Sequence, residues 1–94
     1  MNKETMIAIP RDPNDPEDRD VSVAGVERGH MGRRIRRLRN RLGLSQEGFA
    51  NTYGIPLANI RQYEIGRHMP PPAVRAYLKV IDAEPDVAAR AVAA

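Results

Sequence analysis

The chain has 94 residues, a length that suits one small domain. Hydrophobic residues make up 41% and charged residues 29%, a balance typical of a globular chain with polar extensions. Cysteine is absent, which excludes disulfides, zinc–thiolate sites and thiol catalysis, and the few aromatic residues do not favour a large β-sandwich. No apolar run approaches the length of a membrane span and no apolar signal core opens the sequence, so we expect a cytoplasmic protein.

Charge is sorted along the chain. Residues 1–27 carry three cations and seven anions, a net charge of −4. Residues 28–75 carry ten arginines and two anions, a net charge of +8, and residues 76–94 sum to −1. Such a basic block calls for a polyanion or an acidic partner.

The first twenty or so residues lack the pattern of a folded segment. The stretch IPRDPNDPEDRD (residues 9–20) has three prolines and is strongly acidic. Proline removes amide donors, and little apolar surface is present to offset the entropy of ordering. We therefore expect residues 1–27 to form a flexible, disordered acidic arm and residues 28–94 to form the folded domain. The arm is either a solvated tail or a segment that folds on a partner through Met6, Ile7 and Ile9.

Helical periodicity begins after Ser22, which could cap a short helix. The three glycines that follow each weaken a helix interior by about 1 kcal/mol, so this region is expected to be a frayed leader or an uneven start to the next helix. A clear helix is predicted over about residues 31–42, where the apolar residues recur at helical spacing. Gly43 is expected to end it in the left-handed conformation.

Four further helices follow in chain order. Ser45 is expected to cap a helix that ends at Gly54. The next helix is predicted over residues 56–65, because proline suits a first-turn position, and Gly66 ends it. The last two are predicted over about residues 71–82 and after Pro85. The sequence thus indicates an all-α fold of five short helices, with no strand pattern.

The stretch from Ser45 to Gly66 matches helix-turn-helix geometry, with two helices of about nine residues joined by a tight glycine turn. The segment LGLSQEGFANTYGIPLANIRQYEIGRHMP (residues 42–70) resembles the Xre or Cro/phage-repressor type of helix-turn-helix. The resemblance covers about residues 35–81 and implies a compact, lambda-repressor-like domain. Within this family, residues 54–67 together with 76–78 resemble HigA-type antitoxins, small autorepressors encoded beside a RelE-like toxin.

The resemblance also implies DNA-binding roles, which we carry over by position. Gln46, helped by the Ser45 hydroxyl, would hydrogen-bond a phosphate, and Arg67 would hold the backbone after the second helix. Leu57 and Ala58 can make only apolar contacts, where many relatives carry polar base readers. Hydrogen-bond readout then falls on Asn59, Arg61 and Gln62. Ordinary solvated helix surface is the alternative interpretation of each polar residue in this set.

The arginines around the first clear helix cannot all face DNA. By the same resemblance, Arg39 points toward Glu64 and forms a partly buried ion pair that braces the recognition helix. Of the others, Arg33, Arg36 or Arg37 are expected to reach phosphates.

We expect a sequence-specific regulator that binds double-stranded DNA as a homodimer on a palindromic operator. The candidate dimer interface combines the last helix with Val74, Tyr77, Leu78 and Ile81. The chain is interpreted as an autorepressing antitoxin that also binds a RelE-like toxin through residues 1–27. The alternative is a stand-alone Xre-type repressor with no toxin partner.

Other function classes find little support in the sequence. No carboxylate pair, Ser/His/Asp set or phosphate-cradling loop indicates an enzyme, and no cofactor is expected. His30 and His68 are far apart in the sequence and lack a ligand cluster, so no metal site is expected. No membrane partner is indicated, and the few aromatic residues give no stacking platform for RNA.

Overall fold

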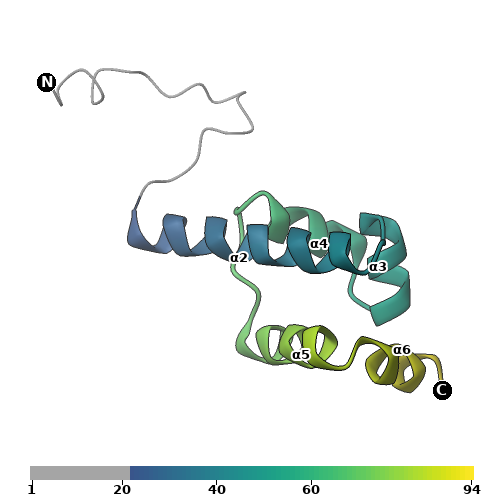
Figure 1. The fold of residues 1–94 in the computed structure, drawn as a ribbon. Helices are drawn as coiled ribbons and strands as arrows, with labels where there is room; N and C mark the ends of the chain where they lie inside the picture. Colours follow the sequence, from purple (N-terminus) through teal and green to yellow (C-terminus); the bar gives the residue numbers. More distant parts are fainter. Residues whose placement is uncertain (1–21) are drawn as a thin grey trace, which may run out of the picture.

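The structure is a computed structural model that describes residues 22–94. Within this range it contains five helices and no strand: α2 (Val23–Arg41), α3 (Gln46–Tyr53), α4 (Leu57–Glu64), α5 (Pro72–Ala83) and α6 (Pro85–Ala93). In Figure 1, α3 and α4 lie along one side of the long helix α2, and α5 and α6 form a second layer below it. The predicted all-α, five-helix fold is confirmed.

The predicted flexible arm covers residues 1–27, of which residues 1–21 lie outside the residues that the structure describes. Its predicted end is wrong, because residues 23–27 belong to helix α2. Among the helices from residue 22 onward, none is both long and apolar enough to cross a membrane.

The segment after Ser22 is the start of the next helix, the second of the two expected alternatives, so α2 begins eight residues before the clear helix predicted from about residue 31. Ser22 caps it: the side-chain Oγ accepts a hydrogen bond from the backbone N–H of Gly25 at 3.1 Å. Gly25, Gly29 and Gly32 are all buried in one face of this helix. This face packs closely against the end of α4: a Cβ on Gly32 would lie only 2.6 Å from the carbonyl oxygen of Glu64. Close packing therefore offsets the weak helix propensity of these glycines.

Three glycines end helices or turns as the sequence predicts. Gly43, Gly54 and Gly66 have φ values of 71°, 70° and 79°, in the left-handed region. Two helix starts differ from the prediction by one residue, since Pro56 and Pro71 are N-caps with extended ψ angles and α4 and α5 begin after them. The Pro56 carbonyl accepts a hydrogen bond from the N–H of Ile60 at 3.1 Å and so starts α4.

The core joins all five helices. Its buried members are Ile35, Leu38, Phe49, Ala50, Tyr53, Ile55, Ile60, Tyr63, Leu78, Ile81 and Ala88. Two tyrosine hydroxyls secure the second layer, as Tyr77 donates to the carbonyl of Tyr53 at 2.6 Å and Tyr53 donates to the carbonyl of Pro85 at 3.1 Å.

The expected dimer interface is wrong for two of its residues. Leu78 and Ile81 are only 7% and 0% exposed, because a domain of this size needs the apolar stripe of α5 for its own core. The exposed large apolar side chains of α5 and α6 are instead Val80, Val87 and Val92.

Candidate nucleic-acid interface

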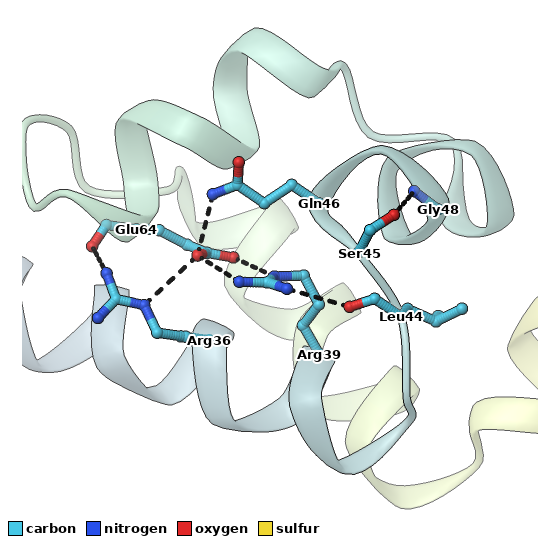
Figure 2. A network of polar contacts seen from close by, with 7 residues as sticks. All are labelled: Arg36, Arg39, Leu44, Ser45, Gln46, Gly48 and Glu64. Atoms are coloured by element: carbon cyan, nitrogen blue, oxygen red, sulfur yellow. Dashed lines mark hydrogen bonds and ion pairs between the residues drawn. The ribbon is translucent and has the colours of Figure 1, made fainter.

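The start of α3 presents two of the residues that the sequence singles out. Ser45 is the exposed N-cap, and its Oγ accepts a hydrogen bond from the N–H of Gly48 at 2.9 Å. Gln46 donates from Nε2 to Oε1 of Glu64 at 3.1 Å, as Figure 2 shows. A glutamine amide has two N–H groups, so Gln46 can give one to Glu64 and keep the other for a phosphate oxygen.

Glu64 is the buried centre of a polar network. It is 5% exposed, and both of its oxygens accept hydrogen bonds from Arg39. The distances are 2.7 Å from Nε to Oε2 and 3.0 Å from Nη2 to Oε1, so the pair is bidentate. Arg39 also donates from Nη1 to the Leu44 carbonyl at 3.0 Å. The Arg39–Glu64 pair that the resemblance implies is therefore present, and it ties α2 to α4 and to the loop before α3 (Figure 2).

Both members of this pair are held in their charged forms. Burial alone would raise the pKa of Glu64, but hydrogen bonds from Arg39 and Gln46 and the nearby positive charges outweigh it and lower that pKa. The hydrogen bond to Glu64 raises the pKa of Arg39 in turn. Removing one partner of a buried pair typically costs about 3–5 kcal/mol, because the other charge is left uncompensated.

Two further arginines, neither of which the sequence places against α4, hold the end of this helix. Arg36 donates from Nη2 to the Glu64 carbonyl at 3.4 Å, and its Nε lies 3.6 Å from Oε1 of the same residue. Arg28 donates from Nε to the Gly66 carbonyl at 3.1 Å. Cations are favourable at a helix C-terminus, where carbonyls lack partners. Arg36 was expected to reach phosphates; its side chain is 51% exposed but braces α4 here.

Helix α4 has one buried and one exposed side. Ile60, Tyr63 and Glu64 point into the protein. The exposed residues include Ala58, Asn59 and Arg61, and Gln62 is half-buried. Leu57 is also half-buried and packs against the core cluster, so less of it can reach a ligand than the sequence suggests.

The residues expected to contact DNA come from three places in the fold. Ser45 and Gln46 lie at the start of α3, and the exposed residues of α4 follow after the Gly54 turn. Arg67 is exposed just beyond the end of α4, where its N–H donates to the Gln62 carbonyl at 3.0 Å. The Gln46–Glu64 hydrogen bond fixes the start of α3 relative to α4.

Comparison with protein families bears on this geometry. Residues 30–91 match the family model described as a helix-turn-helix domain. The chain belongs to this helix-turn-helix domain family. No curated protein and no solved structure gives a match. In a helix-turn-helix domain the first helix of the motif lies across the DNA backbone and the second enters the major groove. Helices α3 and α4, joined by the Gly54 turn, correspond to the first and second helices of the motif, and membership of the family supports a DNA-binding regulator.

Proposed function

We propose that this helix-turn-helix protein is a sequence-specific transcriptional repressor of the Xre type that binds double-stranded DNA. The observation that carries the proposal is the outward polar edge of α4, formed by Asn59, Arg61 and Gln62, on a helix held from below by the buried Glu64 network. A rigid helix with a polar edge can present donors to base edges in fixed positions. A regulator of this kind works where the DNA is, which we take to be the cytoplasm.

Phosphate contacts would set the position of the domain on the duplex. Gln46 and Ser45 offer donors at the start of α3, and the exposed Arg67 offers a cation beyond α4. Base contacts would then fall on Asn59, Arg61 and Gln62, with apolar contact from Ala58 and the exposed part of Leu57. The basic block of residues 28–75 adds a salt-dependent attraction that does not depend on sequence.

One domain of this size reads few base pairs, so we propose a homodimer on a palindromic operator. The half-sites would be about one helical turn apart. The exposed valines Val80, Val87 and Val92 on α5 and α6 are better candidates for the dimer surface than the buried residues of α5.

A second role is suggested by the acidic start of the chain. Residues 1–27 carry a net charge of −4, which suits the cationic surface of a RelE-like ribonuclease toxin. On this reading the protein is an autorepressing antitoxin of the HigA type. The alternative is a stand-alone repressor. A toxin-like reading frame beside the gene favours the antitoxin, and deletion of residues 1–20 should then abolish binding to the product of that frame.

Selection of binding sites from random duplex DNA at two salt concentrations tests the proposed repressor. The expected result is a palindromic motif whose half-sites are about one helical turn apart, with an affinity that falls steeply as salt rises. Recovery of no motif, or equal retention of all sequences, would contradict sequence-specific binding. The same experiment with single-stranded RNA serves as the comparison for nucleic-acid class.

A further inference from the structure

A groove separates α2 from α5 on the side of α2 that faces away from the Glu64 network. Its volume is about 700 Å³. The apolar lining comes from Met31, Ile35, Leu38, Pro72, Ala76 and Leu78. This volume lies within the range of about 300–1,000 Å³ that is usual for binding pockets. In Figure 1 the groove lies between α2 and the layer formed by α5 and α6.

The edges of this groove are strongly basic. Arg34, Arg37 and Arg41 come from α2, and Arg75 and Lys79 come from α5. Asp82 is the one carboxylate in the lining, and it is paired with Arg41 at the C-terminal end of α2. An occupant should therefore combine apolar side chains for the lining with several carboxylates for the edges. A nucleic-acid backbone would supply negative charge from its phosphates but no apolar side chains for the lining.

We infer that residues 6–20 of this chain dock in the groove between α2 and α5. The segment begins with the apolar run Met6-Ile7-Ala8-Ile9 and continues with five carboxylates and two arginines over residues 10–20. It therefore carries both kinds of group that the groove requires, in one continuous stretch. Docking would place the apolar run on the lining and the carboxylates beside the basic edges.

The position of the segment in the chain makes this docking possible. It joins the N-terminus of α2, which is itself one wall of the groove. Met31 is eight residues into that helix, about 12 Å along it at 1.5 Å per residue. The residues between Ile9 and Val23 can span up to about 45 Å when extended, so the run can reach every lining residue. A short tether also gives an effective concentration of about millimolar, so weak contacts suffice.

Docking in this groove does not compete with the proposed DNA binding. The groove uses one side of α2, and the contacts that brace α4 use the side with Gly32, Arg36 and Arg39. Docking leaves the exposed edge of α4 open. A protein partner that binds the same acidic residues would first have to displace them from the groove.

Paramagnetic labelling of the full chain tests the inference. The chain has no cysteine, so Ala8→Cys gives a single attachment point for a nitroxide. We expect strong loss of amide signals from the groove residues Met31, Ile35 and Leu78, with signals from Asn59 retained. The loss should disappear in the charge-reversed variant Arg34→Glu/Lys79→Glu, which changes one exposed residue on each wall, and should weaken at high salt.

The matched control is Arg33→Glu/Arg90→Glu, which makes the same charge change at exposed residues outside the groove and should keep the signal loss. Circular dichroism checks that both variants fold. Intact groove signals in the labelled chain, or equal loss in both charge-reversed variants, would overturn the inference. So would loss that arises only between molecules, seen when labelled chain is mixed with isotope-enriched unlabelled chain, because the groove would then hold the arm of a second copy.

Discussion

Gln46 at the start of α3 and Glu64 at the end of α4 are joined by a hydrogen bond of 3.1 Å from Nε2 to Oε1. The bond links the residue expected to hold a DNA phosphate to the buried carboxylate that anchors α4. Glu64 in turn accepts two hydrogen bonds from Arg39 of α2. One carboxylate thus fixes three helices relative to one another, and the position of a phosphate bound at Gln46 would be fixed relative to α4.

Replacing Gln46 by alanine should weaken DNA binding to all sequences alike. The change removes a neutral donor, so the expected loss is about 1.5–3 kcal/mol, as for a hydrogen bond to a charged group, with an unchanged dependence on salt. Titration of operator and random duplexes at several salt concentrations measures both quantities. A loss confined to the operator would assign Gln46 to base readout instead.

Arg67→Ala should also weaken binding to all sequences, but through charge. Removing one cation from a phosphate contact should lower the slope of log K against log salt by about one unit. Arg67 is exposed beyond α4, so folding should be unaffected. The comparison with Gln46→Ala separates a charged from a neutral phosphate contact, and identical salt slopes for the two variants would show that Arg67 does not touch the backbone.

Asn59→Ala and Gln62→Ala should each reduce affinity for the selected operator by about 1–3 kcal/mol and relax the preference at one base position. Asn59 is exposed and Gln62 is half-buried, so a base edge could reach all of the first side chain and part of the second. Repeating the site selection with each variant measures the effect. Glu47→Gln, an exposed change on α3, is the control and should leave the selected motif as it is. An unaltered motif in both α4 variants would exclude them as base readers.

Much of the fold could be predicted because its signals are local. The left-handed glycines at 43, 54 and 66 and the Ser45 cap act within a few residues of themselves, and the structure has them where the sequence places them. The early start of α2 could not be predicted from propensity, because Gly25 and Gly29 weaken a helix and are offset there only by tertiary packing. Both are buried, and a Cβ on Gly66 would lie 3.4 Å from the Cα of Gly29. A glycine repeat at helical spacing was the available signal for that contact.

The candidate site could be predicted from the sequence only in part. The family resemblance predicts that Arg39 pairs with Glu64. The sequence does not predict which other arginine of α2 contacts α4, because that depends on how the two helices pack, and the structure shows that Arg36 does so. Leu57 likewise occupies a position where many relatives carry a residue that contacts bases, yet in the structure it is half-buried and packs against the core. Tertiary packing decides these two positions.

Gly32→Ala should destabilise the fold by about 1–3 kcal/mol or more, as overpacking does. The added Cβ would lie 2.6 Å from the carbonyl oxygens of both Tyr63 and Glu64, and these backbone atoms cannot rotate away. Gly48→Ala is the matched control, because its Cβ would meet the movable Ser45 side chain at 3.2 Å. Urea unfolding of the two variants compares them. Equal stability would mean that α2 and α4 are not in close contact in solution.

Acidification should remove the stability that Glu64 contributes. Its pKa in the folded protein is lowered from the ordinary value of 4.5, so the unfolded chain takes up the proton more readily. The contribution is therefore complete well above pH 4.5 and is lost as the pH falls through the lowered value. Glu64→Gln should cost about 3–5 kcal/mol at neutral pH, because it leaves Arg39 uncompensated, and the difference from the natural chain should shrink in acid.

Urea unfolding between pH 7 and pH 3 measures this difference at each pH. Glu47→Gln removes an exposed carboxylate and should show only a small difference across the same range, since a charge in the first turn of a helix contributes a few tenths of a kcal/mol to about 1 kcal/mol. If the difference between Glu64→Gln and the natural chain stays constant on acidification, the Glu64 carboxylate does not titrate with folding. The difference in unfolding free energy would then come from hydrogen bonds and packing that glutamine does not reproduce, and not from the charge of Glu64.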